Sequence, residues 1–186
     1  MNNVFVVYCG PMFSAKTTSL LSSIDRFKYQ GKKVAVFKPQ LDDRYNSDFV
    51  CTHSGWKVPA QCIKNGSDIL ELLSEMDDQP NVIAVDEAFM IPNIAKVLTW
   101  LYRNGYTVLV SSLDLSASCK PFGEIEKMLP WATSVEKKSA VCVVCSRDAF
   151  YTYKKQSNDE EIEVGGSELY EARCGKCHPI ACDPEH

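Results

Sequence analysis

Several features are missing from the sequence, and each absence excludes a class of protein. No run of about 18 apolar residues occurs, so a membrane-spanning helix is not expected. The first residues, MNNVFVVYCG, lack the basic flank and cleavage site of a signal peptide, and we therefore expect a cytoplasmic protein. No fixed-period repeat and no low-complexity linker interrupts the 186 residues, a length that suits one hydrophobic core with a small additional module.

An excess of positive charge is also missing. The 20 lysine and arginine residues are outnumbered by 24 aspartate and glutamate residues, which gives a net charge of −4. A protein that binds long nucleic acids usually carries a basic surface, so nucleic acid is not an expected partner. A small phosphorylated ligand remains possible because it needs only local positive charge.

Cysteine, by contrast, is abundant. Four of the nine cysteines form two Cys-x-x-Cys pairs: Cys142, Cys145, Cys174 and Cys177. Without an export signal, a metal site is a better interpretation than disulfides, and two such pairs can close a tetrahedral thiolate site for which zinc is the first choice. The connection 146–173 is longer than the roughly 15–20 residues of common zinc sites, so the metal would hold the base of a long loop. His178 and Cys182 are alternative ligands.

Short apolar runs alternate with helical patterns over the first part of the chain. The runs lie at 4–8, 34–37, 82–85 and 108–110, and their continuous apolar character is typical of strands buried on both faces. Helical spacing of leucine and isoleucine appears at 20–27, 69–73 and 94–101, and a further helix is expected at 121–132. This alternation predicts an α/β fold, with a P-loop parallel sheet flanked by helices over residues 1–140. The cysteine-rich residues 141–186 are expected to form a small zinc-binding module.

The segment GPMFSAKT follows the first apolar run and precedes the first helical pattern. It comprises Gly10, Pro11, Met12, Phe13, Ser14, Ala15, Lys16 and Thr17. In a phosphate-binding loop, backbone N–H groups and a helix N-terminus surround the phosphates, the lysine reaches the outer phosphates, and the next hydroxyl binds Mg²⁺. The flanking strand and helix favour such a loop over an ordinary turn with a surface lysine.

Ala15 stands where the loop motif has its second glycine. If the backbone there needs a positive φ, the Cβ of alanine costs about 1 kcal/mol. The Cβ also crowds the approach of the backbone to a phosphate. We expect the loop to tolerate this strain, because Lys16, Thr17 and the acids described next are all present.

Two acids, Asp86 and Glu87, directly follow the apolar run at 82–85. Ligands of α/β sheets bind at the carboxyl ends of the strands, so both carboxylates are expected beside the phosphate loop. The aspartate is placed to assist Mg²⁺, and the glutamate could accept a proton from an attacking hydroxyl. The alternative is that both residues merely begin the following helix, where acids are common.

These segments together resemble the thymidine kinases of the zinc-containing, tetrameric type. The resemblance runs nearly end to end, through GPMFSAKTTSLL, FKPQLDDRY, CTHSG, VDEA, SLDLSASCKPFGEI, SAVCVVCSRDAFYTYK and VGGSELYEARCGKC. It implies a nucleotide-binding α/β domain with a zinc-held lasso loop over the nucleoside. It also implies ATP-dependent phosphorylation of the 5′-hydroxyl of thymidine and deoxyuridine for nucleotide salvage and DNA synthesis, with Mg²⁺, a structural Zn²⁺ and a homotetramer.

The same resemblance implies a role for each matching position. Glu87 would be the general base, and Gly10 to Thr17 would hold ATP and Mg²⁺ together with Asp42, Arg44 and Asp86. Zinc would take the four paired cysteines. The residues that would contact the nucleoside are Met12, Met90, Leu113, Ala117, Phe122, Thr152, Ile162, Glu163, Val164, Gly165 and Tyr170.

The chain departs from the family at several positions. The family usually has glycine at Ala15 and Leu115, glutamine at Phe89, phenylalanine at Met90 and an aromatic residue at Ala117. These changes indicate a repacked base-binding pocket. Two alternatives follow: a kinase of the same family that accepts another pyrimidine, such as one with a bulkier 5-substituent, or a catalytically weak nucleotide-binding relative. A zinc ribbon that binds nucleic acid is less favoured, because acidic residues offset the lysines of the module.

Overall fold

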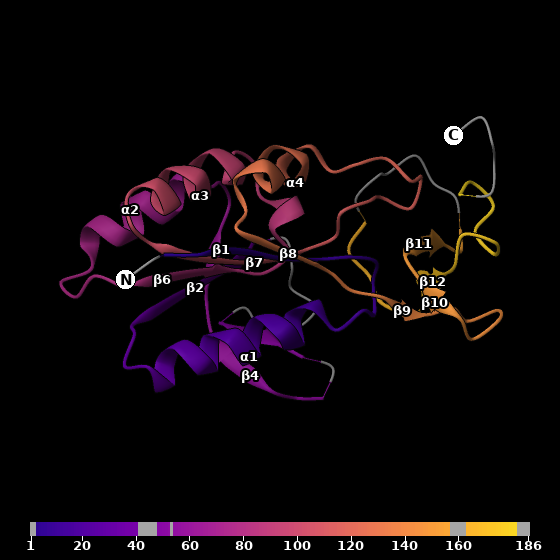
Figure 1. Cartoon of the computed structure of the whole chain (residues 1–186), viewed down its shortest axis with the longest axis horizontal. Helices are drawn as coiled ribbons and strands as arrows, with labels where there is room; N and C mark the ends of the chain where they lie inside the picture. The colour runs from indigo at the N-terminus through magenta and orange to yellow at the C-terminus, as the bar shows by residue number, and fades with distance from the viewer. Residues whose placement is uncertain (1–2, 41–47, 53, 157–162, 182–186) are drawn as a thin grey trace.

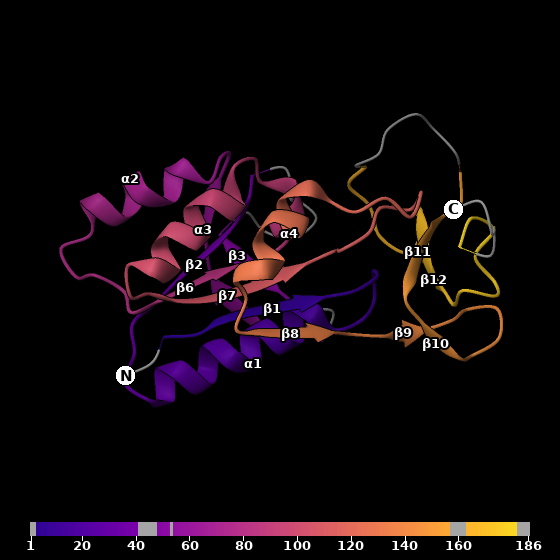
Figure 2. The same ribbon diagram turned by 45° about the horizontal axis from the view of Figure 1, so that its top comes forward.

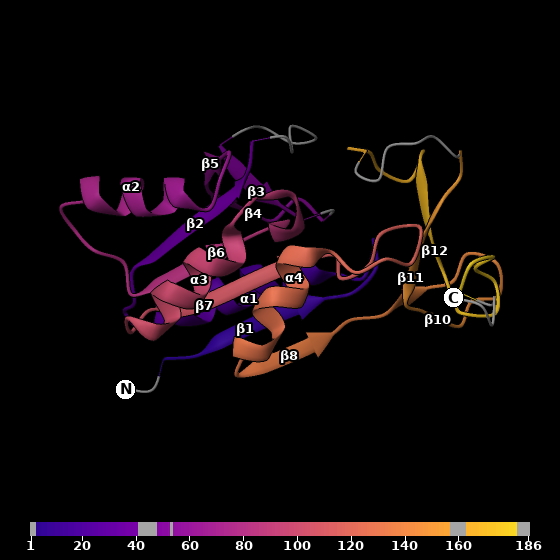
Figure 3. The same cartoon turned by 90° about the horizontal axis from the view of Figure 1, so that it is seen from above.

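A six-stranded parallel sheet forms the centre of the protein, whose computed structural model describes residues 3–40, 48–52, 54–156 and 163–181. The strand order is β5-β2-β6-β7-β1-β8, which Figure 3 shows from above. The strands are β1 (Phe5–Cys9), β2 (Val34–Pro39), β5 (Gln61–Ile63), β6 (Val82–Val85), β7 (Thr107–Ser112) and β8 (Ser134–Lys137). All five pairings are parallel, so the carboxyl ends of the strands lie along one edge.

Helices cover both faces of this sheet (Figure 1). On one face lies α1 (Lys16–Tyr29), and on the other lie α2 (Ser67–Glu75), α3 (Ile94–Arg103) and α4 (Gly123–Met128). Every residue of β6 and β7 is buried as a result, which explains the apolar runs at 82–85 and 108–110. The predicted α/β class with a parallel sheet flanked by helices is confirmed.

Each face has its own hydrophobic core. Leu20, Leu21 and Ile24 of α1 pack with residues of β2, β6 and β7 on one side. On the other side, a larger cluster joins α2, α3 and α4 to the sheet. The antiparallel hairpin of β3 (Phe49–Cys51) and β4 (Lys57–Pro59) adds Val50 and Val58 to the α1 side.

The helix expected at 121–132 is shorter than predicted. It is divided into α4 and a 3-10 turn, η2 (Leu129–Trp131). Pro130 lies within that turn. Proline has no backbone N–H and its ring crowds the preceding turn, so the α-helix ends before it. A second 3-10 turn, η1 (Ala88–Met90), directly follows the two acids after β6.

The C-terminal residues form two small hairpins beyond the sheet, at one end of the molecule (Figure 2). Strand β9 (Ala140–Val141) pairs with β10 (Asp148–Ala149), and β11 (Tyr151–Lys154) pairs with β12 (Tyr170–Arg173). Ala140, Ala149 and Ala172 form a separate small core with Cys142 and Cys174. Among the described residues, no helix is long and apolar enough to cross a membrane.

Candidate active site

The segment after β1 turns sharply into α1. Gly10 has a φ of 139°, and a Cβ there would collide with the backbone carbonyl of Lys138, so only glycine fits. Inside the turn, the carbonyl of Pro11 accepts hydrogen bonds from Ser14 Oγ at 2.8 Å and from Lys16 Nζ at 2.6 Å. These contacts define the loop that the sequence predicted for phosphate.

Ala15 adopts a left-handed conformation, with φ 57° and ψ 29°, at the N-cap of α1. The positive φ considered for this position is therefore present, and it costs an alanine roughly 1–2 kcal/mol. The helix nevertheless begins at Lys16, and Ser19 N donates to the carbonyl of Ala15 at 3.1 Å. The substitution of the motif glycine thus leaves the turn and the helix start intact.

Lys16 is buried at the start of α1. Burial lowers the pKa of Lys16, while the nearby carboxylates of Glu87, Asp86 and Asp114 act in the opposite direction. Its ammonium group is thus held inside the protein beside acids, with a backbone carbonyl as its hydrogen-bond acceptor. A phosphate group is a natural further partner for an ammonium in this position.

Asp86, at the end of β6, is buried and held by two hydroxyls. Ser111 Oγ donates to Asp86 Oδ1 at 2.5 Å, and Thr17 Oγ1 donates to Oδ1 and Oδ2 at 3.2 and 3.3 Å. A hydroxyl and a carboxylate in contact beside a phosphate loop are the oxygen ligands that Mg²⁺ prefers. The donor set therefore fits the predicted magnesium site.

Glu87 is the next residue, and its backbone is left-handed, with φ 49° and ψ 44°. Non-glycine residues in this region are uncommon, and they cluster at functional sites because the surrounding structure must hold them there. The Oε2 atom of Glu87 is buried from solvent. The strained residue thus lies directly after β6, at the carboxyl edge of the sheet.

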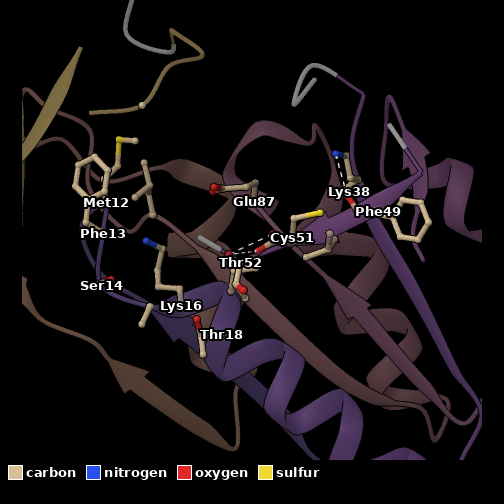
Figure 4. Close-up of a pocket in the computed structure, with 16 residues that line it drawn as sticks. Met12, Phe13, Ser14, Lys16, Thr18, Lys38, Phe49, Cys51, Thr52 and Glu87 are labelled. Atoms are coloured by element: carbon tan, nitrogen blue, oxygen red, sulfur yellow. Dashed lines mark hydrogen bonds between the residues drawn. The ribbon is translucent and has the colours of Figure 1, made fainter. Parts of the chain in front are cut away.

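A cavity of about 110 Å³ opens over the phosphate loop (Figure 4), and we call it the polar cavity because charged and hydroxyl side chains share its lining with apolar ones. Its walls come from the loop, from the ends of β2 and β6, and from the hairpin of β3 and β4. The residues that line it are Met12, Phe13, Ser14, Ala15, Lys16, Thr17, Thr18, Lys38, Phe49, Val50, Cys51, Thr52, Asp86, Glu87, Leu113 and Gly166.

A more apolar cavity of about 40 Å³ adjoins it. The residues that line it are Met12, Glu87, Phe89, Met90, Leu113, Ser116, Ala117, Phe122, Thr152, Glu163, Val164, Gly165 and Tyr170. The rings of Phe89 and Phe122 pack with their centroids 4.6 Å apart. Met12, Glu87 and Leu113 line both cavities, so the two spaces adjoin at these three residues, of which only Glu87 is ionisable.

The C-terminal hairpin is tied to the phosphate loop beside this apolar cavity. Met12 N donates to Thr152 Oγ1 of β11 at 3.0 Å. Tyr170 of β12 donates through its hydroxyl to the carbonyl of Glu163 at 2.9 Å, and Lys154 forms an ion pair with the Glu163 carboxylate at 2.7 Å. These contacts place residues far apart in the sequence around one space.

The structure brings most of the predicted site residues together. Met12 to Thr17 and Asp86 line the polar cavity, whereas Gly10 and Pro11 shape the loop without lining it. Every described residue of the predicted nucleoside set lines the apolar cavity. The predictions for Asp42, Arg44 and Ile162 lie outside the described residues.

Sequence reasoning assigned no role to Lys38 or to the hairpin residues Phe49 to Thr52, which line the polar cavity. Lys38 lies in the segment FKPQLDDRY, and its place at the end of an apolar run was an available signal. The hairpin left no such signal, because its strands have three residues each.

The four paired cysteines converge in the C-terminal module. Their sulfur atoms all lie within 4.8 Å of one another, and Cys145 Sγ is 3.5 Å from Cys174 Sγ. Zinc–sulfur bonds of about 2.3 Å in a tetrahedron require a similar spacing. The set therefore suits zinc, which binds thiolates.

His178, the alternative ligand, is engaged elsewhere. Its Nε2 lies 3.1 Å from the carbonyl of Thr152, and Ala181 N donates to its Nδ1 at 3.2 Å. It is buried and is not a member of the sulfur cluster. Cys182 lies outside the described residues.

A comparison of the chain with protein families agrees with three features of the structure. These are the polar cavity over a phosphate loop, the adjoining apolar cavity and the cluster of four cysteines. The family model described as thymidine kinase matches residues 3–178, which is nearly the whole chain. The chain belongs to the thymidine kinase family and is a nucleoside kinase.

Proposed function

We propose that this protein transfers the terminal phosphate of ATP to the 5′-hydroxyl of thymidine and deoxyuridine. The observation that carries the proposal is the position of Glu87, which lines both the polar and the apolar cavity. A phosphate donor in the first space and a nucleoside in the second would meet at this carboxylate. The product would serve nucleotide salvage for DNA synthesis.

The polar cavity would hold the triphosphate. The loop from Gly10 to Thr17 would surround it with backbone N–H groups, and Lys16 would bind its outer phosphates. Thr17 and Asp86 would hold Mg²⁺, which supplies positive charge to the phosphates when it is bound. Because phosphoryl transfer has a loose transition state, positioning and charge neutralisation account for most of the catalysis.

Glu87 would act as the general base. The attacking 5′-hydroxyl oxygen forms a bond to the terminal phosphorus, the bond from that phosphorus to the bridging oxygen of ATP breaks, and the hydroxyl proton passes to the Glu87 carboxylate. The left-handed backbone of Glu87 keeps the side chain at the junction of the cavities. The carboxylate is thereby in place before substrates bind, and little reorganisation is needed.

The apolar cavity would hold the pyrimidine base among Met90, Phe122 and Phe89. Ala117 contributes only a methyl group where the family usually has an aromatic ring, and Phe89 packs against Phe122. This repacking supports a second candidate function: phosphorylation of a deoxyuridine with a bulkier 5-substituent.

The C-terminal module would close over the nucleoside. Zinc on Cys142, Cys145, Cys174 and Cys177 would fix the base of the loop that carries Thr152 and Glu163 to Tyr170. We further propose a cytoplasmic homotetramer, which the resemblance to zinc-containing tetrameric thymidine kinases supports, and a division between an α/β domain of residues 1–140 and a module of residues 141–186.

A coupled assay of ADP release tests the proposal. Purified protein, ATP and Mg²⁺ would be combined with thymidine, deoxyuridine, 5-substituted deoxyuridines and deoxycytidine in turn. We expect turnover of thymidine and a loss of at least 100-fold in kcat for Glu87→Gln, since general-base catalysis contributes roughly 10²–10⁴-fold. A preference for a bulkier 5-substituent would favour the second candidate, and nucleotide binding without turnover of any nucleoside would contradict both.

A further inference from the structure

Lys38 is a buried cation that has no role in the site as described so far. It lies near the end of β2, and only 3% of its surface is exposed. Lysine is almost never buried to this degree unless its charge is paired, because removing an ammonium group from water is costly. A buried lysine at the carboxyl edge of a parallel sheet therefore needs an anion near its ammonium group.

The described residues do not supply that anion by direct contact. The Nζ of Lys38 donates one long hydrogen bond, of 3.3 Å, to the carbonyl oxygen of Phe49. No ion pair joins it to a carboxylate within the part of the chain that the structure describes. A neutral carbonyl satisfies one of the three donors of the ammonium group, and no carboxylate of the described residues pairs with its charge.

The position of Lys38 shows which anion could reach it. Lys38 follows Phe37, which pairs with Val85 in the sheet, so it stands on the strand next to the one that carries Asp86. Both Lys38 and Lys16 line the polar cavity. Figure 4 shows the two lysines on either side of Glu87, one from β2 and the other from the start of α1.

We propose that Lys38 binds a phosphate of the nucleotide donor from the wall of the cavity opposite Lys16. The inference rests on the proposed function, because it assumes that the polar cavity holds a triphosphate. Two ammonium groups on opposite walls would neutralise more of the triphosphate charge than Lys16 alone. They would also hold the phosphate chain in one orientation across the junction at Glu87.

The test measures binding of MgATP by calorimetry to the full-length, zinc-loaded protein without nucleoside. Lys38→Gln removes the charge but keeps a hydrogen-bond donor for the Phe49 carbonyl. Lys38→Met removes the charge and the donor while keeping an unbranched apolar side chain. We expect each substitution to weaken MgATP binding at least tenfold, and Lys38→Arg to retain binding within about threefold. The KM for thymidine should be unchanged, since Lys38 does not line the apolar cavity.

Lys57→Gln is the matched control. Lys57 also contacts Phe49, with its Nζ 4.9 Å from the centre of the ring, but it is exposed and does not line the cavity. If Lys57→Gln weakens MgATP binding as much as Lys38→Gln does, the effect comes from the hairpin or from overall charge, and the inference is wrong. Normal MgATP affinity in a folded Lys38→Gln protein would also overturn it.

A second measurement needs no stable variant. In wild-type protein with ¹³C-labelled lysine ε-carbons, the Lys38 resonance should shift on addition of MgATP, and an unshifted resonance at saturation would refute the inference. Failure of the proposed function has a different signature, namely wild-type protein that binds MgATP through Lys38 but phosphorylates no nucleoside. Wild-type protein that binds no MgATP would overturn both.

Discussion

At the scale of single residues, the phosphate loop carries a measurable strain at Ala15. Its φ of 57° costs an alanine roughly 1–2 kcal/mol, and its exposed methyl group gains little from packing. Glycine removes the strain but loses about 0.4–1 kcal/mol to the greater entropy of the unfolded chain. We therefore expect Ala15→Gly to raise the free energy of unfolding by about 0.5–1 kcal/mol, measured by urea denaturation of the zinc-loaded protein.

Ala132→Gly is a matched control for this prediction. Ala132 has a φ of −67° and a ψ of 133°, a conformation that alanine adopts without strain. The same substitution there should lower the free energy of unfolding by at least about 0.5–1 kcal/mol, because no strain is relieved and the entropic cost of glycine is joined by the lost packing of the half-buried methyl group against the core. Equal destabilisation by both substitutions would show that Ala15 is not strained.

At the scale of elements, strand β7 ends in two adjacent serines that serve different cavities. Ser111 Oγ donates to Asp86, whereas Ser112 Oγ accepts a hydrogen bond from Phe89 N at 3.1 Å and donates to the carbonyl of Leu113 at 2.9 Å. Successive side chains of a strand point to opposite faces, so neighbours in sequence act on separate sites. The two serines thus offer a matched pair of substitutions.

We expect Ser111→Ala to raise the Mg²⁺ concentration needed for half-maximal activity several-fold, because Asp86 loses the hydroxyl that orients it. Ser112→Ala should instead raise the KM for thymidine several-fold and leave the Mg²⁺ dependence unchanged, since Ser112 holds the backbone of Phe89, which lines the apolar cavity and not the polar one. Steady-state kinetics at varied Mg²⁺ and varied thymidine would separate the two effects. Identical changes in both variants would mean that the serines matter only for stability.

The elements differ in how far the sequence could predict them. Strands β1, β2, β6 and β7 were predicted to within two residues at each end, because burial on both faces forces continuous apolar runs. The hairpin of β3 and β4 was not predicted, since each strand has three residues and buries only its central valine. One buried residue per strand gives no periodic pattern that would distinguish a hairpin from a loop.

At the scale of the whole molecule, the sequence predicted the part of the site that lies in one contiguous segment. It did not predict the parts that form only when distant segments come together in the fold. The loop from Gly10 to Thr17 is contiguous, so its spacing together with the flanking strand and helix indicated phosphate. The left-handed turn at Glu87 and the burial of Lys38 arise only when α1, β2 and β6 are assembled. Grouping Thr152 and Tyr170 with Met12 required the family resemblance, because these residues lie on elements separated by most of the chain.

The C-terminal hairpins and the sheet have separate hydrophobic cores, and this predicts the effect of removing zinc. The C-terminal hairpins have only a small core around Cys142 and Cys174, whereas the sheet has two extensive cores of its own. Metal binding to four thiolates supplies folding free energy that such a small core lacks. Removal of zinc should therefore unfold β9 to β12 while the parallel sheet stays folded.

Hydrogen exchange with a chelator tests this expectation. Amides of β11 and β12 should lose protection, those of β6 and β7 should keep it, and kinase activity should fall because Thr152 and Tyr170 no longer line the apolar cavity. Cys177→Ser should behave like the chelated protein, and Cys62→Ser, at an exposed cysteine of β5, should behave like the wild type. Loss of protection in the sheet together with the hairpins would instead mean that the module and the α/β domain unfold as one cooperative unit, with the bond between Met12 and Thr152 among the contacts that couple them.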